Sequence, residues 1–229
     1  DIIFDYDYID AREDEVIVNF KLLYAYAAMT PDEEEKYKKF TKSIQRRAAT
    51  IGGNDMNDYP LKMLIFNRAR MVKNSKNRIP FGIELLQKHK RDSWIVFTEN
   101  KKQAKEFNKI INTKGYKSAI YNTDLDNAER EENLNNFKNG NLNVLVSCTA
   151  LDEGFDMPEA DGAMILSASS SKRQRIQRMG RVLRITANKQ NALIVTVYSS
   201  KTEFDKLREE SNRYKLEGVP IKWQQMKQV

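Results

Sequence analysis

QRIQRMGRVLR, which spans Gln174–Arg184, is the stretch from which the fold of this chain is predicted. Taken as a helix, it places Gln177, Arg181 and Arg184 on one face. The apolar residues that fall on another face and can pack on a sheet are Ile176, Met179 and Leu183. Gly180 costs about 1 kcal/mol of helix propensity relative to Ala, which favours a close approach of backbone or ligand at that point. Guanidinium groups in fixed positions suit phosphate oxygens, so this face is predicted to receive a triphosphate.

A second pattern lies shortly before this stretch. Cys148–Pro158 has the sequence CTALDEGFDMP and follows a predicted apolar strand at Val144–Ser147. A turn at the carboxyl end of a buried parallel strand is where open α/β sheets bind ligands. A basic helix alone would be interpreted more simply as a solvated or general nucleic-acid-binding face. The two patterns together favour a nucleotide site.

The two patterns resemble motifs V and VI of superfamily-2 helicases and translocases. Motif VI has the form Q-x-x-G-R-x-x-R, and the matching residues are Gln177, Gly180, Arg181 and Arg184. Motif V has the form T-x-x-x-x-G-x-D-x-P, and the matching residues are Thr149, Gly154, Asp156 and Pro158. The order strand, helix, strand around the two motifs is also that of the family.

The resemblance implies a role for each residue of the nucleotide site. Arg181 and Arg184 would reach the β- and γ-phosphates of ATP as catalytic arginine fingers. Gln177 would couple them to the nucleic-acid side. Gly154 would leave room for the motif V turn, and Asp156 would accept hydrogen bonds from the ribose hydroxyls.

Other strand ends are predicted to face nucleic acid. Thr98 and Asn100 follow a predicted strand and are similar to motif IV, where small polar groups and a helix N-terminus hold phosphates. Either residue could instead simply cap the helix that follows. Asn122 and Thr123 follow the next strand and leave the same two interpretations open. In family members the motif V threonine places its hydroxyl on the nucleic-acid backbone, and the resemblance implies this role for Thr149.

Short apolar runs separated by helical stretches predict an α/β fold. The runs are Trp94–Phe97, Ala119–Tyr121, Val144–Val146, Ala163–Leu166 and Leu193–Val197. This alternation favours a RecA-like parallel sheet with helices on both faces. We assign residues 91–229 to this helicase C-terminal core and residues 1–90 to an N-terminal extension, within one structural domain. The tail from Lys201 to Val229 is expected to be an amphipathic helix followed by a basic, Gln-rich end.

The N-terminal extension is predicted to contain a strand and helices. Val16–Ala27 favours a strand or a strand pair. Thr30–Glu33 is a capping box that begins a helix, and further helices are expected at Pro60–Val72 and Phe81–Lys90. The stretch Leu23–Tyr37, with the helices before motif IV, is similar to the XPB-like DNA helicases and their phage relatives.

One half of a nucleotide site is absent from the sequence. No G-x-x-x-x-G-K-[ST] segment occurs, although P-loop enzymes need it for phosphates and an acidic segment for Mg²⁺. The chain begins at Asp1 without methionine. We therefore expect a first RecA-like lobe to precede Asp1 and to bind most of the ATP and Mg²⁺. The 229-residue chain alone is expected to be inactive.

The predicted function is the C-terminal lobe of an ATP-dependent DNA helicase or translocase. DEAD-box RNA helicases usually have histidine where Gln177 stands, which favours DNA. One alternative is a non-catalytic nucleic-acid-binding module with the same fold, and another is an RNA helicase. An upstream Walker A segment would distinguish the enzyme from the binding module.

Composition limits the partners and the chemistry. The net charge of +7 favours a polyanion such as DNA, as a single strand, a duplex or a branched form. No apolar run approaches the roughly 20 residues that cross a bilayer, so we expect no membrane contact and a cytoplasmic location, in a bacterial or phage-infected cell, or a nuclear one in a eukaryote. Cys148 is the only cysteine, which excludes an internal disulfide. His89 has no neighbouring metal-ligand pattern, so no metal bound by side chains is expected.

Overall fold

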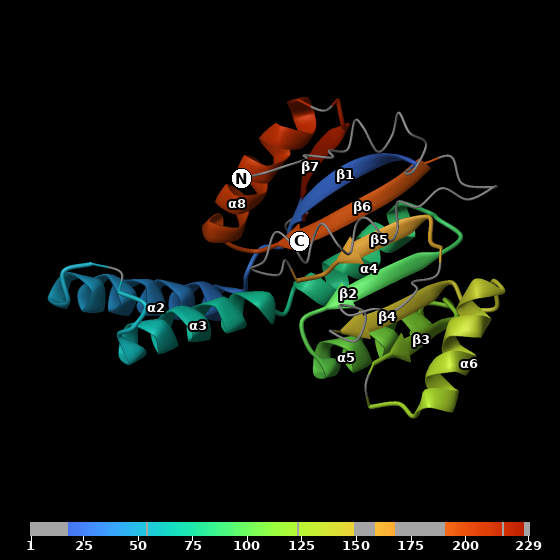
Figure 1. Ribbon diagram of the computed structural model, residues 1–229, viewed down its shortest axis with the longest axis horizontal. Coiled ribbons are helices and arrows are strands. Elements are labelled where there is room, and N and C mark those ends of the chain that lie inside the picture. The colour runs from blue at the N-terminus through green and yellow to red at the C-terminus, as the bar shows by residue number, and fades with distance from the viewer. Residues whose placement is uncertain are drawn as a thin grey trace, which may run out of the picture.

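The strands form a single seven-stranded sheet in the order β3-β4-β2-β5-β6-β1-β7 (Figure 1). The computed structural model describes residues 18–53, 55–122, 124–148, 159–167, 191–216 and 218–226. All paired neighbours within these ranges are parallel. The strands are β1 (Asn19–Tyr26), β2 (Trp94–Thr98), β3 (Ser118–Tyr121), β4 (Val144–Cys148), β5 (Gly162–Ile165), β6 (Asn191–Tyr198) and β7 (Ile221–Gln225).

Helices cover both faces of the sheet. The helices that cover the sheet are α4 (Arg78–Lys88), α5 (Lys101–Thr113), α6 (Asn127–Lys138) and α8 (Lys201–Leu216). The two other described helices are α2 (Pro31–Thr50) and α3 (Tyr59–Lys73). Ile95 and Phe97 of β2 belong to the core under α6 and α8. Trp94 and Val96 belong to the opposite core, under α4 and α5. This alternation along β2 places apolar side chains on both faces, and it confirms the predicted α/β class with helices on both sides.

β1 lies within the sheet although it comes from the first 90 residues. It pairs with β6 on one side and with β7 on the other. Its residues Leu22 and Leu23 are each 2% exposed and contribute to opposite cores. The described part of the N-terminal segment therefore shares the core of the sheet, apart from the helices α2 and α3.

Two glycines allow close packing inside this core. A Cβ atom on Gly82 of α4 would lie 2.6 Å from Leu166 Cδ1 and 3.1 Å from Met164 Sδ. A Cβ atom on Gly162 of β5 would lie 2.6 Å from the Trp94 ring. Any side chain at these positions would displace neighbours in a close-packed interior.

The capping box predicted at Thr30–Glu33 is confirmed, whereas α4 begins at Arg78, three residues before the predicted start at Phe81. Thr30 Oγ1 accepts a hydrogen bond from Glu33 N, and Glu33 Oε2 accepts one from Thr30 N. Asp126 Oδ1 accepts a hydrogen bond from Glu129 N at 2.8 Å and caps α6. These caps satisfy amide groups that would otherwise lack partners at a helix N-terminus.

The expectation for the C-terminal tail is wrong beyond α8. Ile221–Gln225 forms the strand β7, which the sequence did not predict, and it pairs with β1 from Leu22↔Ile221 onward. The Trp223 ring lies 4.6 Å from the Tyr24 ring, measured between centroids. Apolar residues alternate with polar ones in only five positions here, so the period of two is too short to identify the strand from sequence.

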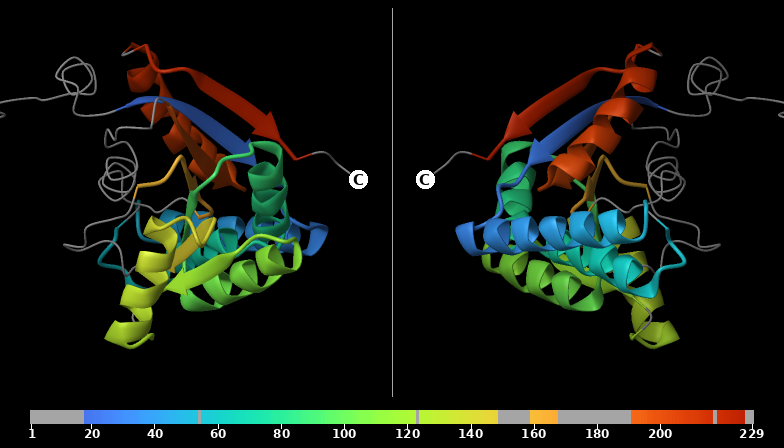
Figure 2. Two further views of the ribbon diagram at one scale, coloured as in Figure 1. Left: turned by 90° about the vertical axis from the view of Figure 1, so that its right-hand side faces the viewer. Right: turned by 90° about the vertical axis from the view of Figure 1, so that its left-hand side faces the viewer.

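α2 and α3 form a helical hairpin (residues 31–73) that projects from the sheet (Figure 1). They remain side by side in the views of Figure 2. Arg47 Nε donates to Asp58 Oδ1 at 2.9 Å, and this bond is the main cause that lowers the pKa of the Asp58 carboxyl. Asp58 also caps α3 through Leu61 N, so the turn between the two helices is fixed at both sides. Within the described residues, no helix is both long enough and apolar enough to cross a membrane.

Candidate functional site

The parallel strands present their carboxyl ends at one edge of the sheet. β2 ends at Thr98, β3 at Tyr121, β4 at Cys148 and β5 at Ile165. Parallel sheets bind ligands at this edge, where the following segments leave the strands. The motif V segment begins directly after β4, and the motif VI segment follows β5.

All residues predicted for the nucleotide site lie outside the described residues: Gly154, Asp156, Gln177, Arg181 and Arg184. Thr123 and Thr149, which are predicted to face nucleic acid, also lie outside them. Their roles stay predictions. The structure shows the strand that precedes each motif segment, which is β4 for motif V and β5 for motif VI.

The motif IV turn is held by hydrogen bonds of its own side chains. Thr98 is 2% exposed, and its hydroxyl lies 3.2 Å from the carbonyl oxygen of Ser147, to which it can donate. Asn100 Oδ1 accepts a hydrogen bond from Gln103 N at 2.9 Å and caps α5. Thr98 therefore holds the turn and Asn100 caps the helix, which is the simpler of the two interpretations that the sequence left open. The N-terminus of α5 lies at the carboxyl edge, and contact with nucleic acid there stays a prediction.

Asn122 orders the turn after β3. Its side chain is 1% exposed, and Oδ1 accepts a hydrogen bond from Asp124 N at 2.9 Å. Lys101 forms an ion pair with Asp124, which joins this turn to the start of α5. The two turns predicted to face nucleic acid are thus neighbours in space.

The last turn of α3 is bonded to the motif IV turn and to the end of β5. Ser167 Oγ donates to the carbonyl oxygen of Lys73 at 2.7 Å, and Gln103 Nε2 donates to the same oxygen at 3.2 Å. Gln103 Oε1 accepts from Glu99 N at 2.9 Å. Lys73 Nζ forms an ion pair with Glu99 Oε1 at 2.8 Å. The base of the helical hairpin is therefore fixed to the residue from which the motif VI segment leaves.

Arg78 is also bonded to this edge of the sheet. It is fully buried, and its guanidinium donates to three carbonyl oxygens, those of Val72, Leu166 and Val197. Its remaining nitrogen, Nη2, lies 2.7 and 2.6 Å from the two carboxylate oxygens of Glu203. The Nε, Nη1 and Nη2 atoms of Arg78 each donate a hydrogen bond, and the Glu203 carboxylate balances the buried positive charge.

No pattern in the sequence identifies this network. Its members come from four separate stretches of the chain and are Lys73 with Arg78, Gln103, Ser167 and Glu203. Lys73 and Arg78 fall in what the sequence indicates only as a polar break between helices. Their ion-pair partners, Glu99 and Glu203, lie 26 and 125 positions away, and no local pattern marks such pairs.

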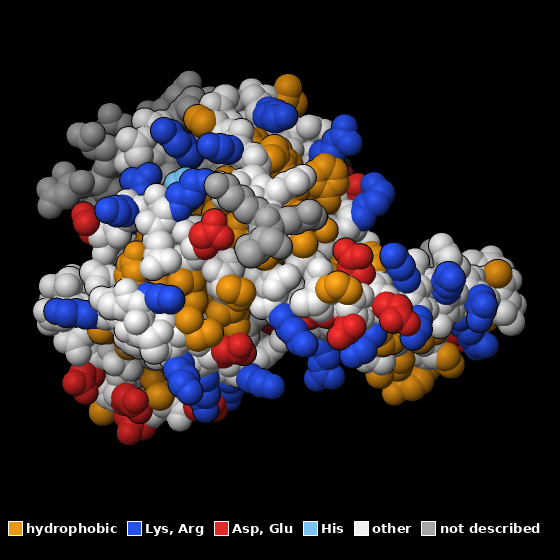
Figure 3. Space-filling model, turned by 180° about the vertical axis from the view of Figure 1, so that it is seen from behind, with side chains coloured by type: hydrophobic (Ala, Val, Ile, Leu, Met, Phe, Trp, Pro, Cys, Tyr) orange, Lys and Arg blue, Asp and Glu red, His pale blue; other side chains and the backbone are white. Residues whose placement is uncertain are grey.

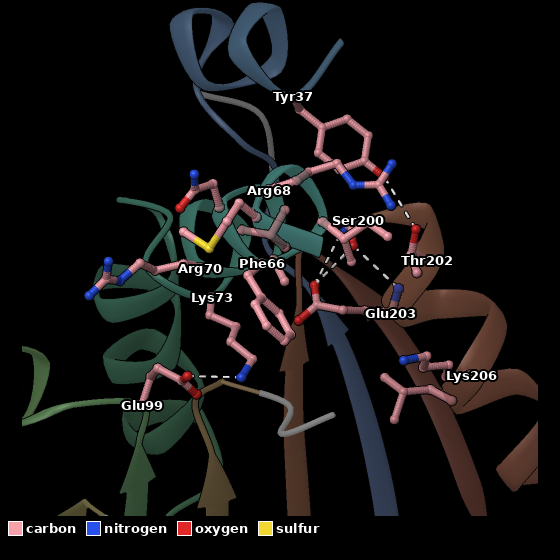
Figure 4. Close-up of a pocket in the computed structure, with 16 residues that line it drawn as sticks. Tyr37, Phe66, Arg68, Arg70, Lys73, Glu99, Ser200, Thr202, Glu203 and Lys206 are labelled. Atoms are coloured by element: carbon pink, nitrogen blue, oxygen red, sulfur yellow. Dashed lines mark hydrogen bonds and ion pairs between the residues drawn. The ribbon is translucent and has the colours of Figure 1, made fainter. Parts of the chain in front are cut away.

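A cavity of about 520 Å³ opens beside this network (Figure 4). α3, Tyr37 of α2, the start of α8 and Glu99 of the motif IV turn line it. Lys73 and Glu203 belong both to its wall and to the network described above. The cavity therefore lies at the carboxyl edge, next to the proposed nucleic-acid turns.

The described residues include no group of three or more His, Cys, Asp or Glu side chains placed to hold a metal ion. Cys148 is buried at the end of β4. Burial raises the pKa of Tyr198 to about 12, so this phenol stays protonated at neutral pH. His89 Nε2 is buried and has no hydrogen-bond partner among the described residues.

The half-buried His89 is expected to make stability depend on pH. Burial is the largest cause that lowers its pKa, and Lys88, Lys222 and Arg91 lower it further. The unfolded chain then binds a proton below about pH 6.5 that the folded chain excludes. Stability is fully present above that pH and is lost as the pH falls toward the lowered pKa.

The measurement is the melting temperature of the wild type and of His89→Asn between about pH 7.5 and about pH 5. We expect the wild type to lose more stability than the variant over this range. A difference between the two proteins that stayed constant with pH would contradict the assignment.

Residues 77–186 match the family model described as the helicase conserved C-terminal domain. The DNA 3'-5' translocase XPB2 of Sulfurisphaera tokodaii is 28% identical over 202 residues, which cover 81% of this chain and 44% of that protein. The ATP-dependent RNA helicase DBP3 of Candida glabrata is 26% identical over 168 residues, covering 66% of this chain and 31% of that protein. This chain thus spans less than half the length of these curated relatives.

A solved structure supports the fold assignment. The C-terminal domain of the DEAD-box protein Dbp5 superimposes with a TM-score of 0.57 at 20% identity. The match covers 66% of this chain and 85% of that domain. At this identity the likeness concerns the fold, and it confirms the predicted RecA-like class.

Proposed function

This chain contains the C-terminal helicase domain of superfamily 2, and from this premise we propose that it is the second lobe of an ATP-dependent DNA helicase or translocase. The observation that carries the proposal is the common carboxyl edge of β2, β3, β4 and β5. The motif IV turn and Asn122 lie at this edge, and the motif V and VI segments leave from it. One edge would thus serve both the strand and the nucleotide.

The predicted residues of the nucleotide site suit ATP by their chemistry. Arg181 and Arg184 supply guanidinium groups for the β- and γ-phosphates, Asp156 supplies a carboxylate for the ribose hydroxyls, and Gly154 leaves space. Bound ATP supplies the phosphoanhydride bond whose hydrolysis drives the enzyme. The arginines stabilise the charge that develops on the transferred phosphoryl group. We assign Mg²⁺ and most ATP contacts to a first RecA-like lobe.

The proposed strand track runs over the turns after β2 and β3. The first backbone amides of α5 can bind anions because they lie at a helix N-terminus, and Asn100 fixes where that helix starts. Thr98, Asn122 and Thr149 complete the predicted track, and Gln177 would link it to the arginines. We propose DNA rather than RNA because Gln177 replaces the histidine usual in DEAD-box RNA helicases, and we propose a cytoplasmic location.

The test is nucleic-acid-stimulated ATP hydrolysis by the full-length protein. We expect single-stranded DNA to raise the rate, and we expect the 229-residue chain alone to hydrolyse no ATP. If neither the full-length protein nor an obligate partner carried a Walker A segment, and no hydrolysis were found, the non-catalytic binding module would be the correct function.

Binding of a labelled single-stranded oligonucleotide to the 229-residue chain should be weak and should fall steeply with salt. One lobe makes few phosphate contacts, and each releases counterions. Titration at about 50 and about 200 mM salt measures the effect. A tight complex with the same affinity at both salt concentrations would contradict a phosphate track on this lobe.

A further inference from the structure

The cavity between α3 and α8 has the size of a ligand site. Its volume of about 520 Å³ lies within the roughly 300–1,000 Å³ of small-molecule pockets. Figure 4 shows Phe66, Arg70 and Lys73 on one side of it and Ser200, Thr202 and Lys206 on the other. The hydroxyls of Tyr37 and Thr202 lie 3.3 Å apart, so one hydrogen bond joins the helical hairpin to α8 across the cavity.

An aromatic ring is left uncovered at the wall of this cavity. Phe66 is 51% exposed, and Met63, one turn earlier on α3, is 37% exposed. Lys62 Nζ lies 5.9 Å from the centroid of the Phe66 ring, near the outer limit of a cation–π contact. A solvent-exposed ring of this kind suits a partner with a planar group that can stack on it.

The Tyr37 ring is held in place by its neighbours. Arg68 Cζ lies 5.4 Å from its centroid, and Arg68 Nη1 donates to Thr41 Oγ1 at 3.1 Å. The guanidinium thus stacks over the ring while it is anchored to α2. The Phe66 ring has only the Lys62 amine near it, at 5.9 Å, and Phe66 is 51% exposed, so its ring is the more accessible of the two to a ligand.

The charges at the wall favour an anion. Both acids are paired within the protein, Glu99 with Lys73 at 2.8 Å and Glu203 with buried Arg78 at 2.6 Å. Arg70 and Lys206 are exposed, and neither makes a hydrogen bond or ion pair through its side chain with another of the described residues. They lie on opposite sides of Phe66 in Figure 4. Figure 3 shows further basic side chains along the helical hairpin, beside a hydrophobic patch.

An aromatic face between two cations matches the chemistry of a nucleotide within a strand. A base stacks on the ring, and the phosphates on either side of it meet the cations. Continuity favours a strand over a free nucleotide, because Glu99 of the cavity wall belongs to the turn proposed to carry the nucleic-acid track. A base inside a duplex has both faces stacked already, so only a single strand can fill the cavity.

We infer that this cavity holds one unstacked base of single-stranded nucleic acid on Phe66, with flanking phosphates on Arg70 and Lys206. The inference rests on the proposed function and adds to it a base-holding site between the helical hairpin and α8. Such a site would make the protein prefer single-stranded DNA over duplex without reading the sequence of the strand.

The experiment compares affinities of the full-length protein for a single-stranded oligonucleotide and a duplex of equal length, without ATP. Phe66→Ala should weaken single-strand binding by about 5- to 140-fold, the effect of about 1–3 kcal/mol per stacked base. Duplex binding should change less than about twofold. Phe66→Trp should restore single-strand binding because it restores a stacking face.

Tyr59→Ala is the matched control. Tyr59 is an aromatic residue on the same helix, 70% exposed, and it does not line the cavity. We expect this variant to bind both forms of DNA like the wild type. Arg70→Gln with Lys206→Gln should lower the slope of log affinity against log salt by roughly 1.4, because two phosphate contacts to a single strand each contribute about 0.7.

Three results would overturn the inference. Phe66→Ala could bind single strands as tightly as the wild type, or it could lose single-strand and duplex binding equally. Alternatively, dAMP could displace the oligonucleotide at equal phosphate concentration, which would indicate a site for a free nucleotide. None of these results depends on ATP hydrolysis, so failure of the base-holding site and failure of the proposed enzyme are distinguishable.

Discussion

Arg184→Ala in the full-length protein is expected to lower ATP turnover by ~10³ or more, the effect of a lost arginine finger. Folding and DNA binding should stay close to those of the wild type. The motif VI helix predicted from sequence separates guanidinium groups from its apolar face, so we do not expect the core to need Arg184. Arg181→Ala is expected to behave in the same way.

The measurement is the DNA-stimulated ATPase rate together with the melting temperature of each variant. Arg173→Ala is the matched control, because Arg173 is predicted to lie on the same helix and has no motif role. A near-normal rate for Arg184→Ala would contradict the arginine-finger assignment. So would a loss of activity that accompanied a lower melting temperature, since the arginine would then serve the fold.

The parallel sheet could be predicted because its strands are buried on both faces. Strands such as Val144–Cys148 and Trp94–Thr98 are apolar at nearly every position and are buried throughout, which gives a signal in a short window of sequence. The helix caps at Thr30 and Asp126 are equally local, since each bonds to a residue three positions on. Local chemistry of this kind can be predicted from sequence alone.

The position of β1 and the existence of β7 depend on long-range contacts. Leu22 of β1 pairs with Ile194 of β6 and with Ile221 of β7, and no feature of residues 19–26 specifies either neighbour. β7 is only half-buried, so its strand pattern is weak. The aromatic cluster that covers it joins Tyr198, Phe204 and Trp223, from three consecutive elements, to Tyr24 of the distant β1.

The candidate site divides along the same line. The resemblance to family motifs predicts the nucleotide residues from sequence, and these residues lie outside the described part of the chain. The network around the last turn of α3 could not be predicted, because Ser167 and Gln103 meet at the backbone oxygen of Lys73 only in the folded chain. A backbone acceptor leaves no trace in the identity of its residue.

Glu203→Ala is expected to be the most destabilising single change among the described polar contacts. The carboxylate bonds to the fully buried guanidinium of Arg78 at 2.6 and 2.7 Å. It also accepts hydrogen bonds from the backbone amides of Ser199 and Ser200 at the start of α8. Removing one partner of a buried pair costs about 3–5 kcal/mol, because the other charge stays buried without compensation.

For a chain of this size, that loss lowers the melting temperature by on the order of 10 °C, which calorimetry of the full-length protein or of the chain would measure. Asp205→Ala is the matched control two residues later on α8. Its ion pair with Lys201 at 3.2 Å is exposed, and exposed pairs contribute about 0–1 kcal/mol. If Glu203→Ala melted within a degree or two of Asp205→Ala, Arg78 would have another route to satisfaction. The guanidinium would then hold Val72, Leu166 and Val197 together through its carbonyl bonds alone, and the carboxylate would serve only to start α8.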